Sequence, residues 1–123
     1  MLAVPTDMTR REQVDRLIAR TVERFGRLDV LLNNAGHSAM APIEKMPVEV
    51  YRSLIELNLF GVLYATQAAI PVMRAQGGGL IVNISSMTTR QLWPSLGGYA
   101  STKHALNSCP RRCAWKSPAT ISA

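Results

Sequence analysis

Two short, uninterrupted apolar segments, separated by a long stretch with helical periodicity, constrain the fold of this chain most strongly. The first covers residues 28–33 and the second covers residues 80–85. Unbroken apolar runs of this length are typical of strands that are buried on both faces of a parallel sheet. Residues 9–25 and 48–76 have helical patterns instead. The alternation of helix and strand predicts an α/β fold with a parallel sheet and right-handed crossovers.

Polar residues, glycines and prolines mark the expected ends of these helices. Residues 9–12, Thr-Arg-Arg-Glu, have the spacing of a capping box with Thr9 as the N-cap, and Gly26 predicts the end of the first helix. Pro47 suits the first turn of the second helix. We expect that helix to bend near residues 58–61 or at Pro71.

The charge distribution argues against a nucleic-acid-binding protein. The net charge is +6, but all eight acidic residues lie at or before Glu56, and residues 104–123 carry three basic residues and no acidic one. Three cations interspersed with prolines and small residues are too few for a phosphate-binding surface. We therefore expect no nucleic acid as partner.

Membrane, export and metal signals are also weak. The chain has no run of 18 or more apolar residues, and residues 1–7 lack the basic start and apolar stretch of a signal peptide. We expect a soluble, cytoplasmic protein without a membrane partner. Cys109 and Cys113, with only His104 nearby, make a poor zinc site, so we expect free thiols and no metal.

The strongest chemical signal is the segment Tyr99-Ala-Ser-Thr-Lys103, which follows Ser86 by thirteen residues. We expect a helix from about Gly98, on which Tyr99 and Lys103 share one face. A free phenol has a pKa of about 10, and an ammonium group beside a phenol favours the phenolate. With a serine hydroxyl to bind a carbonyl or alcohol oxygen, this set suits proton transfer coupled to carbonyl reduction or alcohol oxidation.

Other motifs stand in a fixed order with this segment. The first apolar run ends in Asn33-Asn-Ala-Gly36, Asn58 lies in the long helix, and the second apolar run ends in Ser85-Ser86. In this order and at these spacings, residues 2–106 resemble the short-chain dehydrogenase/reductase family. The resemblance implies a Rossmann-like, doubly wound parallel sheet and hydride transfer between NAD or NADP and a secondary alcohol or ketone.

The resemblance also assigns catalytic roles. Tyr99 matches the residue that exchanges a proton with the substrate oxygen, and Lys103 matches the lysine that lowers the tyrosine pKa and binds the nicotinamide ribose. Ser86 matches the serine that orients the substrate carbonyl. Asn58 matches the asparagine that supports a water-linked proton relay, with a kink residue bonded to its own backbone as the alternative.

Further positions match the cofactor side of the family. Asn34, Ala35 and Gly36 match the turn that passes close to the cofactor, and Gly36 suits a close backbone approach. Asp7 matches the acid that touches the adenine ring, or it is an ordinary loop acid.

Four other residues have expected roles of a different kind. Asn33 is expected to tie neighbouring strands together. His37 and Thr88 border the expected pocket, where His37 either shapes substrate choice or is a solvated loop residue. Trp93 either lines the substrate side or fills a gap in the core.

The family's glycine-rich turn, GxxxGxG, has no counterpart in this sequence. That turn holds the dinucleotide pyrophosphate at a helix N-terminus. The resemblance therefore implies a partial Rossmann-type domain over residues 1–108, with strands three to five of the family fold and their flanking helices. The sheet would lack the strand beside its fourth strand, so we expect residues 1–123 alone to be unstable or to fold only partly.

Residues 109–123 depart from the family pattern. Pro110 interrupts the tyrosine helix, and no helical period follows. This segment is either a divergent tail or, as we favour, the result of a reading-frame error. Cys113-Ala-Trp-Lys-Ser-Pro118 can be encoded by bases that, shifted by one nucleotide, spell Leu-Arg-Leu-Glu-Val-Ala, which would continue an amphipathic helix.

Two functions follow from these observations. The first is an NAD(P)-dependent short-chain dehydrogenase/reductase acting on a small alcohol or carbonyl substrate. The second is a catalytically inactive, truncated remnant that cannot bind the dinucleotide. Full-length members of the family form homodimers or homotetramers through the long helix and the tyrosine helix, and the shortened tyrosine helix makes such assembly doubtful here.

Overall fold

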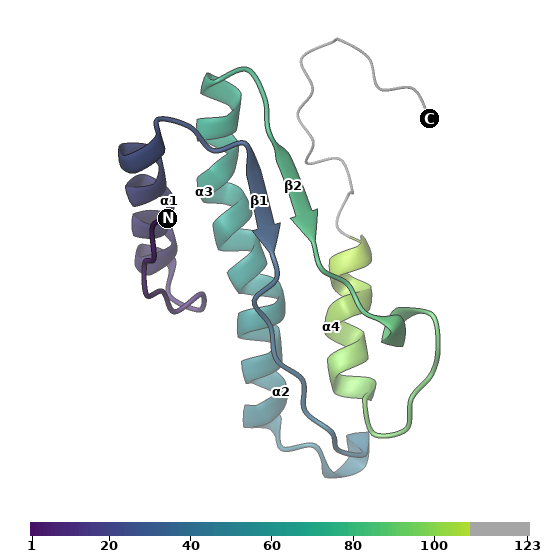
Figure 1. The fold of residues 1–123 in the computed structure, drawn as a ribbon. Helices are drawn as coiled ribbons and strands as arrows, with labels where there is room; N and C mark the ends of the chain where they lie inside the picture. The colour runs from purple at the N-terminus through teal and green to yellow at the C-terminus, as the bar shows by residue number, and fades with distance from the viewer. Residues whose placement is uncertain (109–123) are drawn as a thin grey trace, which may run out of the picture.

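The computed structural model describes residues 1–108, so the expected divergent tail, with Cys109 and Cys113, lies outside the described part. Helices α1 and α3 and strands β1 and β2 follow one another across the molecule in Figure 1. The elements in chain order are α1 (Arg11–Phe25), β1 (Val30–Asn33), the 3-10 helix η1 (Ile43–Lys45), α2 (Val48–Ile55), the π-helix η2 (Glu56–Gly61), α3 (Val62–Ala75), β2 (Leu80–Asn83), the 3-10 helix η3 (Met87–Thr89) and α4 (Gly97–Ser108).

The two strands form a parallel pair, as the sequence predicts. The expected strand three of the family fold is absent, since residues 1–10 form no strand and the sheet of the described residues consists of β1 and β2. Val30 lies opposite Leu80, and Asn33 lies opposite Asn83. Both strands are shorter than expected, since β1 starts at Val30 and β2 ends at Asn83. Both point toward the end of the molecule where α4 and η3 lie (Figure 1). The carboxyl ends of the strands therefore lead directly into the loops that carry the expected site residues.

One face of this sheet is covered and the other is open. Leu31 and Ile81 pack against a cluster formed by α1, α3 and the start of the first apolar run. On the opposite face the side chains of Val30 and Leu32 are 54% and 56% exposed, and Leu80 is also exposed. The prediction that these strands are buried on both faces is therefore wrong for one face.

The first helix begins differently from the prediction and ends as predicted. Arg10, not Thr9, is the N-cap, and its side chain makes no capping bond. The Thr9 hydroxyl instead donates to Asp7 Oδ1 at 2.7 Å. At the other end, Gly26 has φ 76° and its N–H donates to Val22 O. This left-handed backbone conformation at the helix C-terminus is the one for which glycine is favoured.

The long helix spans three segments, α2, η2 and α3. Its irregular π segment, Glu56–Gly61, coincides with one of the two expected bend positions, while Pro71 lies inside α3. Pro47 precedes the helix as its N-cap rather than standing in the first turn. A π turn widens the helix locally and is frequent at functional sites.

This helix, Val48–Ala75, is long and apolar enough to cross a membrane by length and composition alone. The sequence predicted a helix here, but the expectation of no membrane span considered only unbroken apolar runs. It therefore did not identify this helix as a candidate span. Core helices of folded domains meet the same criterion. Here Ala69 and Met73 belong to the hydrophobic cluster that covers the sheet, and Leu54 and Ala65 are also buried. We therefore interpret Val48–Ala75 as the central helix of the fold.

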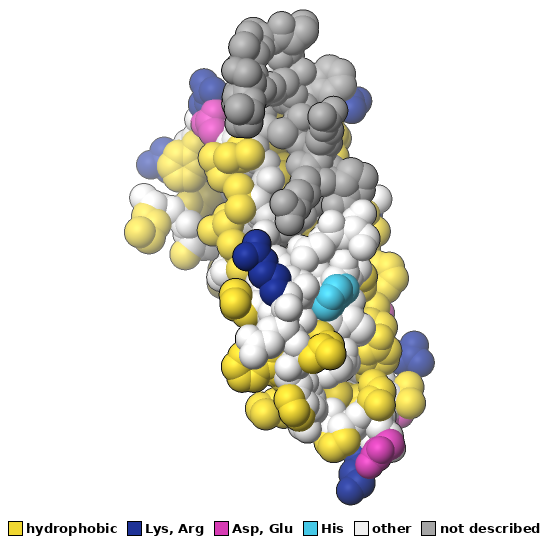
Figure 2. Space-filling model, turned by 90° about the vertical axis from the view of Figure 1, so that its right-hand side faces the viewer, with side chains coloured by type: hydrophobic (Ala, Val, Ile, Leu, Met, Phe, Trp, Pro, Cys, Tyr) yellow, Lys and Arg dark blue, Asp and Glu magenta, His cyan; other side chains and the backbone are white. Residues whose placement is uncertain are grey.

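Large hydrophobic side chains are also exposed in the loops that follow the two strands. Figure 2 shows a face on which hydrophobic side chains are more frequent than charged ones. The exposed residues of this kind in these loops and their 3-10 turns are Met40, Ile43, Ile84, Met87, Leu92 and Trp93. Because Trp93 is half exposed, the alternative that it fills a gap in the core is wrong within the described residues.

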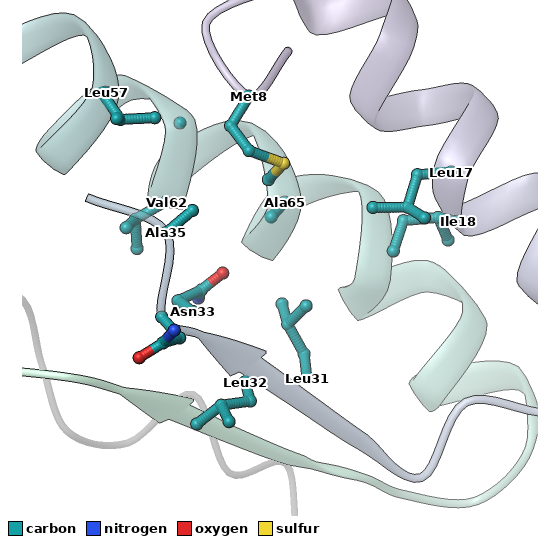
Figure 3. A pocket seen from close by; sticks show the side chains of 12 residues that line it. Met8, Leu17, Ile18, Leu31, Leu32, Asn33, Ala35, Leu57, Val62 and Ala65 are labelled. Atoms are coloured by element: carbon teal, nitrogen blue, oxygen red, sulfur yellow. The ribbon is translucent and has the colours of Figure 1, made fainter. Parts of the chain in front are cut away.

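A slot lies beside β1, on the side away from β2 (Figure 3). In the described part of the chain β1 has β2 as its one strand neighbour, so its other edge is free. We call this site the β1 slot. Its lining is mostly apolar and comprises Met8, Leu17, Ile18, Leu31, Leu32, Asn33, Asn34, Ala35, Leu57, Gly61, Val62 and Ala65.

Candidate active site

Tyr99 and Lys103 lie together on α4, one helical turn apart. Lys103 Nζ is 5.8 Å from the centroid of the Tyr99 ring. The lysine side chain is only 5% exposed, and its ammonium group donates a hydrogen bond to Ile84 O at 2.8 Å. This carbonyl follows β2, so the bond fixes the ammonium group at the carboxyl end of the sheet.

Burial changes the acidity of this ammonium group. Desolvation disfavours the charged form, so it lowers the pKa of Lys103 from its ordinary value. A buried lysine whose ammonium group is held by a hydrogen bond can donate a proton, or a hydrogen bond to a ligand, from a fixed position. Its ammonium group lies beside the Tyr99 ring, so a positive charge next to this phenol would favour the phenolate.

Asn58 lies in the π segment and is 1% exposed. Its Oδ1 accepts from the His37 backbone N–H at 3.1 Å, and its Nδ2 donates to the His37 carbonyl at 3.0 Å. Nδ2 also donates to Thr102 Oγ1 at 3.1 Å. The side chain therefore bonds to the loop after β1 and to α4, which contradicts the alternative that it bonds its own backbone.

Gly36 stands where these groups converge. A Cβ atom at this position would lie 3.0 Å from Asn58 Oδ1 and 3.8 Å from Lys103 Nζ. The backbone of Gly36 is thus closely packed against Asn58, and its expected approach to the cofactor stays a prediction. The structure therefore brings together Gly36, Asn58, Tyr99 and Lys103 at the carboxyl end of β1 and β2.

Ser86 begins the η3 turn beside this cluster. Its Oγ accepts from the Thr88 N–H at 3.2 Å, and η3 packs against α4. Ser86 follows Ile84, the residue whose carbonyl holds Lys103, by two positions. The hydroxyl of Ser86 is therefore held near the start of the loop that faces α4.

Two buried hydroxyl groups beside Ser86 have no hydrogen-bond partner within residues 1–108. They are Ser85 Oγ and Thr88 Oγ1. Thr88 is buried, as suits a residue expected to border the pocket.

Asn33 ties the sheet together, as the sequence predicts. Its Nδ2 donates to Asn83 Oδ1 at 2.8 Å across the strand pair and lies 3.4 Å from Thr66 Oγ1 on α3. The next two residues, Asn34 and Ala35, are exposed and line the β1 slot. Ala35 is labelled there in Figure 3. The last residue of β1 is therefore a structural asparagine, and the turn after β1 begins with two exposed residues.

The carboxylate of Asp7 accepts hydrogen bonds within a local turn. The hydroxyl and the backbone N–H of Thr9 both donate to its carboxylate, and they hold the pKa of Asp7 below its ordinary value. The carboxylate is exposed, and its neighbour Met8 lines the β1 slot. The local bonds agree with an ordinary loop acid and leave the expected adenine contact a prediction.

His37 contributes mainly through its backbone, which Asn58 holds from both sides. Its ring is exposed, and Nε2 lies 3.2 Å from Ser53 O on α2. The ring therefore has a partner and is not simply solvated.

Sequence reasoning missed Thr102. It is 1% exposed, and its hydroxyl donates to Tyr99 O at 2.8 Å while accepting from Asn58. The signal available in the sequence was a hydroxyl three residues after the tyrosine, a spacing that lets a threonine bond to the tyrosine carbonyl on a helix. The bond to Asn58 joins residues 44 positions apart, so spacing alone could not reveal it.

Comparison with known proteins agrees with this arrangement. The short chain dehydrogenase family profile matches residues 1–118. An uncharacterised oxidoreductase of Methylorubrum extorquens is 44% identical over 107 residues, which cover 87% of this chain and 42% of that protein.

Solved structures of the same kind superpose on the chain. A gluconate 5-dehydrogenase from Burkholderia cenocepacia, in complex with NADP and tartrate, has a TM-score of 0.77 and 35% identity over 81% of this chain and 39% of its own. An NAD⁺-bound xylitol dehydrogenase has a TM-score of 0.78 and 31% identity over 82% of this chain and 39% of its own.

The chain spans about two fifths of the length of these relatives: 42% of the Methylorubrum protein and 39% of each of the two solved structures. It matches solved Rossmann-fold structures over part of their length, which confirms the expected α/β fold with a parallel sheet. The chain belongs to the short-chain dehydrogenase family.

Proposed function

We propose that the protein containing this chain is an NAD(P)-dependent oxidoreductase that interconverts a secondary alcohol and a ketone, with Tyr99 as proton donor and acceptor. The observation that carries the proposal is the pair of buried side chains Asn58 and Lys103, which meet at Gly36 beside the Tyr99 ring. The NADP-bound and NAD⁺-bound relatives support a nicotinamide cofactor of either kind.

The residues present fit one end of such a cofactor. A buried ammonium group at Lys103 and the close approach at Gly36 suit the nicotinamide ribose, and the exposed Asn34 and Ala35 suit a contact farther along the cofactor. The sequence holds no glycine-rich turn for the pyrophosphate. The nicotinamide, when bound, supplies or accepts the hydride at the substrate carbon.

The residues of this chain would handle the substrate oxygen. In ketone reduction, Ser86 orients the carbonyl oxygen, and the Tyr99 phenol gives that oxygen a proton as the carbon receives the hydride. The products are the alcohol and a tyrosinate, which the ammonium group of Lys103 stabilises until the phenol is reprotonated. Alcohol oxidation reverses each of these transfers.

An inactive remnant is the second candidate, and the missing glycine-rich turn together with the free edge of β1 favours it for residues 1–123 alone. Fluorescence titration with NADH and NADPH separates the two candidates. Saturable binding by this chain, with turnover of a generic diketone, would contradict the remnant function.

Replacing Tyr99 by phenylalanine tests the proton transfer. In the full protein that contains this chain, we expect the Tyr99→Phe variant to lose about 10²- to 10⁴-fold in turnover, because the general acid is gone. The dissociation constant for NADH or NADPH should stay near its normal value. Turnover within about tenfold of the unmodified protein would overturn the assignment of Tyr99.

A further inference from the structure

We propose that Thr102 is a positioning residue, whose hydroxyl group holds the Tyr99 turn of α4 in place against Asn58. The inference rests on the proposed function and adds a residue to it. Thr102 lies between two residues of the candidate site in the chain, but its side chain points to neither the phenol nor the ammonium group. It bonds to the backbone of one site residue and to the side chain of another.

The directions of these hydrogen bonds are fixed by chemistry. A threonine hydroxyl has a single hydrogen, and Thr102 donates it to the Tyr99 carbonyl at 2.8 Å. The oxygen of Thr102 must then accept from Asn58 Nδ2 at 3.1 Å. The result is a one-way series from the Asn58 amide through the hydroxyl to the Tyr99 carbonyl, and buried bonds in such a series strengthen one another.

The other bonds of Asn58 tie this series to the loop after β1. The Asn58 amide holds both the N–H and the carbonyl of His37, which follows the closely packed Gly36. Both amide hydrogens of Asn58 are used, one toward His37 and one toward Thr102. The loop after β1 holds the Asn58 amide, and Asn58 in turn bonds to Thr102. Thr102 therefore connects this loop to the Tyr99 turn of α4.

Helix α4 has a second anchor immediately after the first. Thr102 bonds to η2, and Lys103 bonds to the carbonyl of Ile84 beyond β2. Two anchors on consecutive residues, directed to two different elements, restrict both rotation and translation of the helix. Ser101 adds a third bond on this turn, with Tyr51 Oη on α2 at 2.9 Å, but that bond is exposed to solvent. With the Thr102 hydroxyl removed, Lys103 would make the one remaining buried bond among these three, and the phenol and ammonium groups would sample a wider range of positions.

The test measures turnover and cofactor binding in the full protein that contains this chain. Thr102→Val removes the hydroxyl and retains the branched shape, while Thr102→Ser retains the hydroxyl. Thr21→Val is the matched control, because the Thr21 hydroxyl donates to Leu17 O at 2.9 Å on α1, away from the site. Urea unfolding of each variant establishes that it is folded.

We expect Thr102→Val to lower kcat by about 10- to 100-fold, as small misplacements of catalytic groups do, while KM for the cofactor changes little. Thr102→Ser retains the hydroxyl, so its kcat should stay within about threefold of that of the unmodified protein. Thr21→Val should leave kcat unchanged.

Each contrary result has a distinct meaning. If the unmodified protein turns over but Thr102→Val matches Thr21→Val in kcat, the positioning role is wrong and the proposed function stands. The same conclusion follows if Thr102→Ser fails to restore kcat. If the unmodified protein shows no NAD(P)-dependent turnover with any secondary alcohol or ketone, the proposed function fails and the positioning role fails with it.

Discussion

The cluster around Asn58 and the open side of β1 differ in how completely their groups are paired. In the cluster, Asn58, Thr102 and Lys103 are buried and each has a hydrogen-bond partner. Along β1, large apolar side chains are exposed, and one strand edge has no strand beside it within residues 1–108. Sheet faces and edges of this kind are normally covered in stable folds. The comparison teaches that the polar groups of the candidate site find their partners within this chain, whereas one face and one edge of the sheet at β1 are uncovered in the described residues.

The largest expected effect concerns the β1 side as a whole. We expect the backbone amides of β1 and β2 in residues 1–123 alone to exchange with solvent much faster than in the full protein that contains this chain, because an uncovered sheet face opens at little cost. Amide hydrogen exchange measures this directly. Slow exchange and a cooperative unfolding transition in residues 1–123 alone would show that the open side needs no further cover.

A smaller effect tests the tight packing of the cluster. We expect Gly36→Ala to reduce the free energy of unfolding of the full protein by about 1–3 kcal/mol, because the new methyl group would meet the buried Asn58 amide. Gly97→Ala is the matched control, since a Cβ there has nothing within 4 Å. Urea unfolding compares the two. Equal stability of both variants would mean that the cluster can relax around Gly36.

The hydrogen bond between the strands gives the next effect. We expect Asn33→Ala to reduce the free energy of unfolding by about 0.5–1.5 kcal/mol, because the buried Asn33 side chain no longer donates its hydrogen bond to Asn83 Oδ1. The adjacent Asn34→Ala removes an exposed side chain and should change stability by less than about 0.5 kcal/mol. Thermal or urea unfolding of both variants distinguishes them. If Asn34→Ala lost more stability than Asn33→Ala, Asn34 rather than Asn33 would be the structural asparagine.

The smallest effect is a pH dependence that comes from Lys103. Burial lowers the pKa of Lys103 in the folded protein below its ordinary 10.5. Between the lowered pKa and 10.5 the unfolded chain holds a proton that the folded chain has lost, so this group makes folding more favourable as the pH rises through that window. Lys103→Met should remove this contribution to the urea-unfolding free energy measured up to about pH 10.5. An unchanged pH slope in Lys103→Met would contradict it.

Local signals in the sequence predicted part of the site and missed another part. The four-residue spacing places Tyr99 and Lys103 on one helix face, and the Asn-Asn-Ala-Gly turn places Gly36 just after a strand. The capping prediction at Thr9 is wrong because Asp7 takes the hydroxyl of Thr9 within its own turn. The bond between Asn58 and Thr102 could not be predicted, because a π turn and the packing of α4 bring the two residues together.

The sequence by itself determined the order of strands and helices, the parallel pairing of β1 and β2, and the family, because these depend on periodicity and on motifs separated by fixed numbers of residues. Only the tertiary structure decided which polar groups are paired and which sheet face is open. Asn58 meets His37 and Thr102 through packing between distant segments. Val30 and Leu31 are adjacent apolar residues of one strand, yet only Leu31 is covered, because α1 and α3 lie on its side alone.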